Sequence, residues 1–216
     1  MMKNITRQLI IFVKAPEIAK CKTRLISLLG EQGATDFYKD LATHCVQQFH
    51  DLNGIDVTLS CHPDIHHDFL QQLSKNYQVG LQAQQGKDLG ERMYNAIECS
   101  LFHYQQCVLI GSDCPSLTPE YIEQAFSALN SHDIVLGPAS DGGYVLIGAG
   151  KVDPELFAHT QWSSHNVLQQ CLKNIENLNY SHHLLARLWD IDTPDDFIQN
   201  QTQIQALLNK QYHTGY

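Results

Sequence analysis

The sequence predicts an α/β fold: one domain, residues 1–216, with three αβα layers around a mostly parallel, doubly wound sheet. Three observations predict it. A length of 216 residues suits one domain with a substantial core. Short apolar runs alternate along the chain with longer segments whose apolar residues recur every three or four positions. One run, Val108 to Ile110, stops at Gly111 and leads to Asp113, as a buried parallel strand does at its carboxyl end.

Each element is expected from its local pattern. Strands are expected at 8–13, 56–61, 79–83, 133–138 and 143–148, another is expected to end at Asp113, and short extended segments are expected at 180–185 and 188–191. Helices are expected at 31–52, 67–76, 89–104 and 119–129, from Ser163 or Ser164 to 178, and from Thr193 onward. Thr118 and Thr193 each precede a proline, a pattern typical of a helix N-terminus. The alternation as a whole is typical of a Rossmann-like sheet with right-handed crossovers.

Charge and composition narrow the class of partner. Fourteen basic and twenty-three acidic residues give a net charge of −9, which argues against broad binding to nucleic acid or anionic membranes. The apolar segment near the N-terminus breaks at Lys14 and is too short to span a membrane, so we expect a cytoplasmic protein. Seven cysteines without CxxC spacing are expected to be reduced thiols. We expect small-molecule ligands, and the sequence leaves a homodimer open.

A basic loop follows the first predicted strand. Lys14, Lys20, Lys22 and Arg24 supply four of the fourteen basic side chains within eleven residues, and Ala15 and Pro16 belong to the same loop. The loop lies before a helix whose first N–H groups are free, so its composition and position favour phosphate binding. It has neither the GxxxxGK[ST] nor the GxGxxG pattern. A solvated basic turn is the alternative.

Carboxylates are expected at the same edge of the sheet. Asp113 follows a buried strand, and Asp190 and Asp192 share one face of an extended segment before the last predicted helix. A hard divalent cation is commonly held by one or two carboxylates together with substrate phosphates, so Asp113 with Asp190 or Asp192 is a candidate metal site. The alternative for Asp113 is that it only closes a turn or stabilises the start of the following helix.

Two glycine-containing loops are further candidates. Gly86 lets the backbone come close to a ligand, and Asp88 could accept hydrogen bonds from a base or a ribose, although it could equally cap the helix that follows. The loop from Asp141 through Gly142 and Gly143 to Tyr144 offers a carboxylate, a flexible backbone and an aromatic ring for a substrate. A plain hairpin turn is the alternative.

Five motifs in one order carry a family resemblance. They are Val13-Lys-Ala-Pro with Lys22-Thr-Arg-Leu, Gln85 to Met93, Gly111-Ser-Asp-Cys-Pro, Gly137-Pro-Ala-Ser-Asp-Gly-Gly-Tyr, and Asp190-Ile-Asp-Thr-Pro-Asp-Asp. Over about 9–197 the chain resembles the nucleotide-diphospho-sugar transferase superfamily of the GT-A fold. More narrowly, it resembles the bacterial glycosyltransferase A branch, which is related to molybdenum-cofactor and phospholactate guanylyltransferases. The first loop usually carries Pro-Gly where this chain has Ile18-Ala19, and the second motif often has Gly-Gly-Asp where this chain has Gly86-Lys-Asp88.

The resemblance implies roles for these residues. Lys14, Lys22 and Arg24 would bind nucleotide phosphates, the Asp88 loop would lie near the nucleoside, and Asp113 with Asp190 or Asp192 would hold Mg²⁺ or Mn²⁺.

The activity expected first is glycosyl transfer from a nucleotide sugar to a small-molecule acceptor. Lys22 and Arg24 would neutralise the leaving phosphate, and the Asp141 loop would orient the acceptor. The alternatives are nucleotidyl transfer from a nucleoside triphosphate to a phosphorylated small molecule with release of pyrophosphate, and a nucleotide-binding module without turnover.

Overall fold

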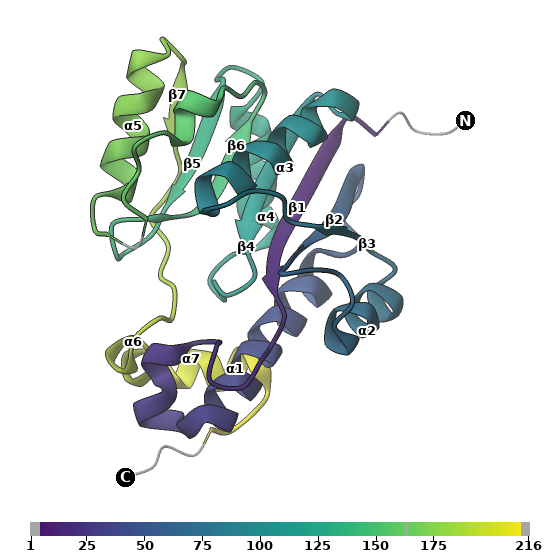
Figure 1. The fold of residues 1–216 in the computed structure, drawn as a ribbon, viewed down its shortest axis with the longest axis vertical. Helices are drawn as coiled ribbons and strands as arrows, with labels where there is room; N and C mark the ends of the chain where they lie inside the picture. Colours follow the sequence, from purple (N-terminus) through teal and green to yellow (C-terminus); the bar gives the residue numbers. More distant parts are fainter. Residues whose placement is uncertain (1–4, 163, 213–216) are drawn as a thin grey trace.

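The sheet is mixed and mostly parallel. The computed structural model describes residues 5–162 and 164–212, and in these it forms a seven-stranded sheet of order β3-β2-β1-β4-β6-β5-β7 (Figure 1). The strands are β1 Arg7–Lys14, β2 Ile55–His62, β3 Gly80–Ala83, β4 Gln106–Gly111, β5 Ile134–Pro138, β6 Tyr144–Ala149 and β7 His182–Leu184. Strand β6 runs antiparallel to both β4 and β5, and every other pairing is parallel. The predicted α/β class is confirmed.

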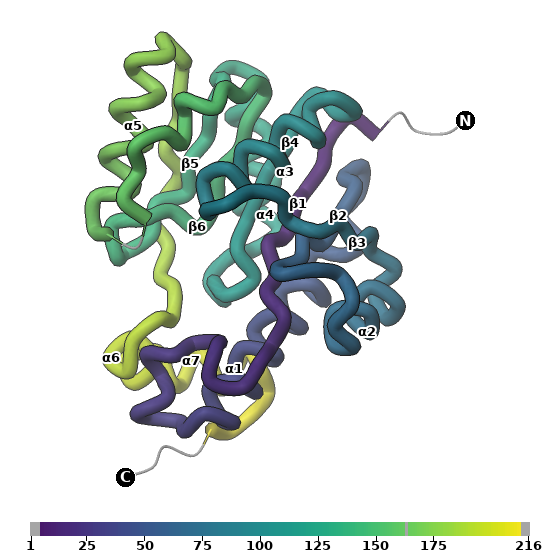
Figure 2. Tube along the Cα trace, viewed as in Figure 1, coloured from purple at the N-terminus to yellow at the C-terminus, as the bar shows by residue number. Residues whose placement is uncertain are grey.

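Helices cover both faces of the sheet. They are α1 Ile26–Phe49, α2 Asp68–Tyr77, α3 Leu89–His103, α4 Pro119–Ala128, α5 Val167–Asn177, α6 Pro194–Gln199 and α7 Gln201–Leu208, with short 3-10 helices η1 Thr23–Leu25 and η2 Pro154–Phe157. Successive residues of β1 point to opposite faces: Leu9 and Ile11 pack with α1, α2 and α4, whereas Ile10 packs with α3 and α5. The tube in Figure 2 shows these layers.

A third core lies beside the sheet. Leu25 and Phe37 at the N-terminal side of α1 pack with Ile191, Phe197 of α6 and Ile204 of α7. The C-terminal half of α1 packs against the sheet instead, so this one helix joins both cores. The chain reaches the third core through the segment between β7 and α6, which passes from the upper to the lower part of Figure 1.

Several boundaries differ from the prediction. Helix α1 spans Ile26–Phe49 but consists of two helical segments joined at Gly30, whose backbone is not helical (φ 72°, ψ 169°); the second segment starts at 31 as predicted, and the short segment before Gly30 was not predicted. Strand β4 ends at Gly111, and the segment 188–191 forms one isolated bridge, Ala139 with Leu188, rather than a strand. Helix α5 begins at Val167, beyond Ser164, and Ser163 lies outside the described residues.

Other local predictions are confirmed. Thr118 and Thr193 are N-caps, and Thr193 forms a capping box with Asp196. All seven cysteines are free, and burial raises the pKa of Cys114 to about 11.

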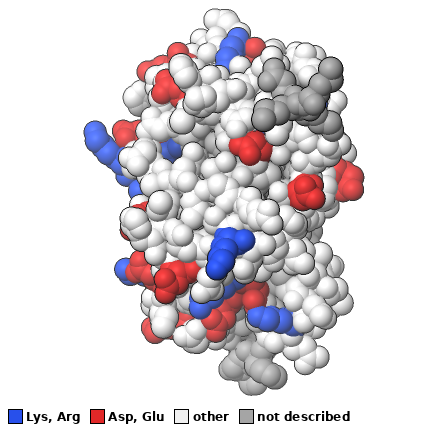
Figure 3. All heavy atoms as spheres, turned by 90° about the vertical axis from the view of Figure 1, so that its right-hand side faces the viewer, with Lys and Arg blue, Asp and Glu red and all other residues white. Residues whose placement is uncertain are grey.

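None of the helices in 5–162 and 164–212 is both long and apolar enough to cross a membrane. On the face in Figure 3, the described basic side chains form no continuous patch and lie beside acidic ones.

Candidate functional site

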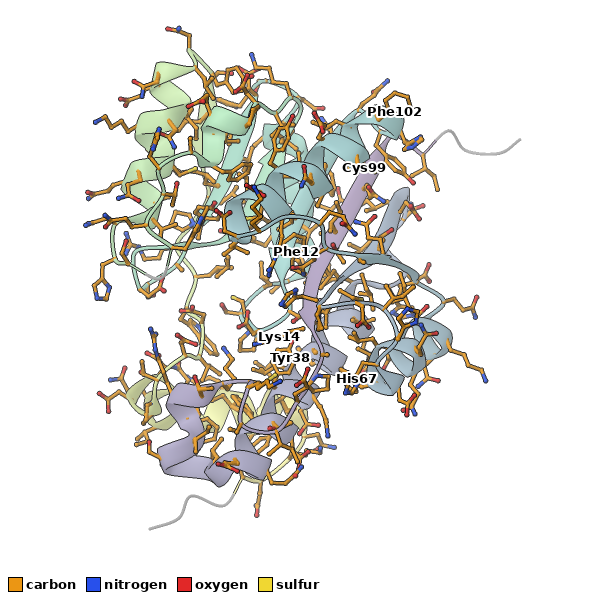
Figure 4. All side chains as sticks on the ribbon, viewed as in Figure 1. Phe12, Lys14, Tyr38, His67, Cys99 and Phe102 are labelled. Atoms are coloured by element: carbon orange, nitrogen blue, oxygen red, sulfur yellow. The ribbon has the colours of Figure 1, made fainter. Side chains whose placement is uncertain are left out.

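A cleft of about 530 Å³ opens at the carboxyl ends of β1, β2 and β4. This is the edge where open α/β sheets place their ligands. Figure 4 shows Phe12, Lys14 and Tyr38 one below another at the end of β1, between the sheet and the lower helices. All three line the cleft, together with Lys20, Lys22, His62, Gln84, Arg92, Asp113, Tyr144 and Asp192. Lys14, Lys20 and Lys22 therefore face the same space as Asp113 and Asp192, whereas the predicted site residues Arg24 and Asp190 do not line it.

Lys22 is the buried centre of this cleft. Its side chain is 4% exposed, and its backbone is left-handed (φ 46°, ψ 45°), a conformation uncommon outside glycine. Its ammonium donates to Asp113 Oδ2 at 2.9 Å and to the carbonyl of Ile191 at 2.6 Å, and lies 3.6 Å from Asp192 Oδ1. Burial alone would lower the pKa of Lys22, but the carboxylates of Asp113 and Asp192 outweigh it and raise the pKa. The lysine is therefore held charged by the carboxylates.

The ion pairs continue from Lys22 to the surface. Arg24 Nη1 donates to Asp192 Oδ2 at 2.6 Å, and the arginine side chain is 59% exposed. Asp192 thus lies between one buried and one exposed cation. Lys22 and Arg24, both expected to bind phosphate, are paired here with carboxylates.

The carboxylates differ in their surroundings. The Lys22 ammonium holds the pKa of Asp113 below its usual value. Burial and the charges of Asp141 and Asp113 raise the pKa of Asp190 to about 6. In the part of the chain that the structure describes, no three metal-binding side chains converge as a complete metal site. Two carboxylates and bound phosphates remain a suitable donor set, because magnesium and manganese prefer such oxygen ligands.

Two other basic side chains of the cleft, those of Lys14 and Arg92, can still bind an anion. Lys14 Nζ donates to the carbonyl of Lys20, and Arg92 Nε donates to the carbonyl of Gly86. Lys20 pairs with Glu17 on the loop surface. Among the described residues, neither Lys14 nor Arg92 forms an ion pair with a carboxylate.

Sequence reasoning missed His62, Gln84 and Arg92 as cleft residues. His62 pairs in register with Lys14 at the ends of β2 and β1, so the rule that ligands bind at strand carboxyl ends could have found it. Burial lowers the pKa of His62, and the nearby charges of Arg92 and Lys14 lower it further. Arg92 belongs to the motif from Gln85 to Met93, but the sequence of this motif did not show that the Arg92 side chain would point into the cleft.

Several predicted residues lie at the margin of the cleft. Ala15 is buried and its N–H donates to the carbonyl of His62, while Pro16 follows it. Asp88 is the N-cap of α3 and accepts from the N–H of Glu91 at 2.9 Å, as its alternative interpretation expected. Neither Gly86 nor Asp88 lines the cleft, whereas Leu89 and Met93 of the same segment do.

The loop after β5 is a hairpin. Asp141 Oδ1 accepts from the N–H of Gly143 at 2.8 Å, and His165 Nδ1 lies 2.9 Å from the carbonyl of Asp141. Strands β5 and β6 pair directly across this turn, so the alternative interpretation, a plain hairpin turn, is confirmed. Of the four predicted residues, Tyr144 lines the cleft and the turn residues, Asp141 to Gly143, do not.

Comparisons with known proteins place the chain in a family. Residues 45–164 match the family described as "Uncharacterized protein conserved in bacteria (DUF2064)". The chain belongs to this DUF2064 family. No curated protein sequence matches it. Among solved structures, a candidate nucleotide-diphospho-sugar transferase from Desulfovibrio desulfuricans G20 is 30% identical, with a TM-score of 0.83 and 94% of each chain covered. The resemblance drawn from the five motifs is confirmed.

More distant structures share the fold alone. The 4-diphosphocytidyl-2C-methyl-D-erythritol synthase of Anaerococcus prevotii has a TM-score of 0.61 at 10% identity, over 94% of this chain and 97% of that one. The glucosyl-3-phosphoglycerate synthase of Mycobacterium tuberculosis, solved with Mn²⁺ and uridine diphosphate, has a TM-score of 0.57 at 10% identity, over 94% and 78%. This DUF2064 chain thus has the fold common to glycosyltransferases and nucleotidyltransferases.

Proposed function

We propose that this protein is a metal-dependent transferase that uses a nucleotide-activated donor, and that the donor is a nucleotide sugar. The observation that carries the proposal is the cleft itself: Lys14, Lys20 and Lys22 at the end of β1 face the same space as Asp113, which follows the adjacent strand β4. A charged diphosphate needs cationic side chains and a metal-binding carboxylate together. The relative at 30% identity, described as a candidate nucleotide-diphospho-sugar transferase, supports the sugar nucleotide as donor.

The donor set suits Mg²⁺ or Mn²⁺. Asp113 with Asp190 or Asp192 would hold the ion, and the substrate phosphates would complete its ligands. When bound, such an ion would neutralise charge on the leaving diphosphate.

The protein's own residues would bind and orient the two substrates. Lys14 would hold phosphate oxygens, Ala15 and Pro16 would shape the loop around them, and Lys22 with Arg24 would neutralise the leaving group. The segment from Gly86 and Asp88 into α3 would lie along the nucleoside. A small-molecule acceptor would be placed by the hairpin of Asp141, Gly142 and Gly143 and by Tyr144, which reaches the cleft wall.

Nucleotidyl transfer is the second candidate. The fold shared with a 4-diphosphocytidyl-2C-methyl-D-erythritol synthase favours it. The same cleft would then hold a nucleoside triphosphate, and a phosphorylated acceptor would attack the α-phosphorus and release pyrophosphate. Release of pyrophosphate from a triphosphate distinguishes this reaction from glycosyl transfer. Tight binding without any product would instead favour a nucleotide-binding module.

The deciding experiment is a thermal-shift screen with nucleotide sugars and nucleoside triphosphates, each with and without Mg²⁺ or Mn²⁺. We expect a rise in Tm that needs the metal and is largest for one nucleotide sugar, because a ligand of the native state stabilises it. Asp113→Asn should abolish this rise. Asp51→Asn, an exposed aspartate just after α1, is the matched control and should respond as the parent does. Equal shifts in Asp113→Asn and the parent would refute the metal assignment.

A further inference from the structure

Lys22 is paired with Asp113 and Asp192, two of the three carboxylates that are candidate metal ligands. We propose that its ammonium competes with the metal for Asp113 and Asp192. The metal would then bind well only when a phosphate replaces these carboxylates as the partner of the lysine. The inference deepens the proposed function, and its phosphate half rests on that function. The competition itself concerns this chain's carboxylates and can be tested without any nucleotide.

The Lys22 ammonium is committed to oxygens of this chain. Two of its three N–H donors are hydrogen-bonded, to Asp113 Oδ2 and to the carbonyl of Ile191, and Asp192 Oδ1 lies 3.6 Å away as an ion-pair partner. Because the side chain is only 4% exposed, the ammonium presents little surface to a phosphate in the cleft. Close contact with a phosphate therefore requires Lys22 to move away from these partners.

The same carboxylates are candidate ligands for the metal. Asp113 and Asp192 are 45% and 40% exposed, so both remain accessible from the cleft although the lysine beneath them is buried. A divalent cation and an ammonium cannot both be neutralised by this pair without strong mutual repulsion. Binding of one therefore weakens binding of the other.

Release of Lys22 without a new partner would be costly. A buried charge that loses its partner is strongly destabilising, and the side chain of Lys22 is only 4% exposed. A phosphate in the cleft would supply the missing negative charge. Metal and phosphate should therefore bind with positive coupling, and by linkage the coupling is the same in both directions.

The backbone at this lysine is also constrained. Lys22 has a left-handed φ of 46° although it is not glycine. Such a conformation costs free energy and persists where the surrounding structure requires it. The contacts of the buried Lys22 side chain with Asp113 and Ile191 are part of that surrounding structure.

The test measures Mn²⁺ binding to the protein alone, with free Mn²⁺ quantified by electron paramagnetic resonance. Lys22→Met removes the competing charge and should bind Mn²⁺ roughly tenfold more tightly than the parent, within the usual range of such couplings. Lys39→Met is the matched control, because it removes a lysine–aspartate pair on the surface of α1, where Lys39 lies 3.2 Å from Asp36. It should bind Mn²⁺ as the parent does. Equal or weaker binding by Lys22→Met would overturn the inference.

A second variant provides the same test if Lys22→Met does not fold. Lys22→Gln removes the charge but keeps a polar N–H₂ group in place of the ammonium. It should also bind Mn²⁺ more tightly, and Mn²⁺ should raise its Tm more than that of the parent. If Lys22→Met does not melt cooperatively, Lys22→Gln decides the question by the same criterion.

The outcomes separate this inference from the proposed function. Tighter Mn²⁺ binding by the charge-removing variants, with no nucleotide bound by the parent, would keep the competition and refute the transferase. Metal-dependent nucleotide binding by the parent, with no gain in Mn²⁺ affinity in the variants, would refute the competition alone.

Discussion

Gly142 is the residue at which the hairpin between β5 and β6 meets the loop before α5. Its φ is +93°, and a Cβ built on it would lie 2.2 Å from the carbonyl oxygen of His165. The carbonyl of Gly142 also accepts from the N–H of Leu168 at the start of α5. The turn can therefore approach the next loop only with glycine at this position.

Gly142→Ala should destabilise the protein by about 1–3 kcal/mol, because it adds both backbone strain and a clash with backbone. Thermal unfolding would measure the loss. Gly143→Ala is the control: its Cβ would meet Asp141 Oδ1, the end of a side chain, at 3.2 Å. We expect it to be milder, and equal losses in the two variants would contradict the argument.

Among elements, β7 depends on a small polar network at the edge of the sheet. Asp133, just before β5, accepts from the N–H of Ser181 at 2.7 Å and from its hydroxyl at 2.8 Å, and pairs with Lys151 at 3.0 Å. Burial alone would raise the pKa of Asp133, but the hydrogen bonds from Ser181 and Lys151 outweigh it and hold the pKa below its usual value. The ionised carboxylate of Asp133 thus stabilises the pairing of β7 with β5.

Asp133→Asn should lower the free energy of unfolding by about 1 kcal/mol at pH 7. A carboxyl with a depressed pKa contributes stability above the usual aspartate value, about 3.9, and loses it as the pH falls through the folded-state pKa. The difference between parent and variant should therefore shrink below about pH 4. Denaturant melts at pH 7 and near pH 3 would show this, with Asp51→Asn as control. A difference that does not depend on pH would count against the network.

For the whole molecule, α1 couples the sheet to the third core. Phe37 is fully buried there, and its ring lies 5.2 Å from that of Phe197 and 5.1 Å from that of Tyr212. Further along α1, Ala42 and Phe49 pack against the sheet. A loss of packing at Phe37 is therefore transmitted to both parts by one helix.

Phe37→Ala should destabilise the protein by about 3–5 kcal/mol, the usual cost of removing a buried phenylalanine ring. The unfolding transition should remain single, because α1 belongs to both cores. Phe102→Ala is the matched control: this phenylalanine also lies on a helix, but it is 85% exposed, so the change should stay within about 0.5 kcal/mol. Two separated transitions in the Phe37 variant would show that the cores unfold independently.

Local rules predicted the elements well where one short pattern decides the outcome. The caps at Thr118 and Thr193 and the capping role of Asp88 depend on neighbours within four residues, and all are observed. Only the short helical segment before Gly30 was missed, because the non-helical backbone at Gly30 separates it from the longer helix that starts at 31 as predicted. Among the missed residues of the cleft, His62 directly follows the predicted strand 56–61 and could have been found, whereas the direction of Arg92 on α3 depends on packing that no local pattern specifies.

The sequence by itself determined the α/β class and the strand edge where the basic loop and Asp113 come together, because apolar periodicity and the parallel-sheet rule act along the chain. Only the tertiary structure decided that Lys22 pairs with Asp113 and the carbonyl of Ile191, partners 91 and 169 positions away. The reason is that the Lys22 side chain is buried between segments far apart in the chain, and no local pattern specifies how such segments pack together.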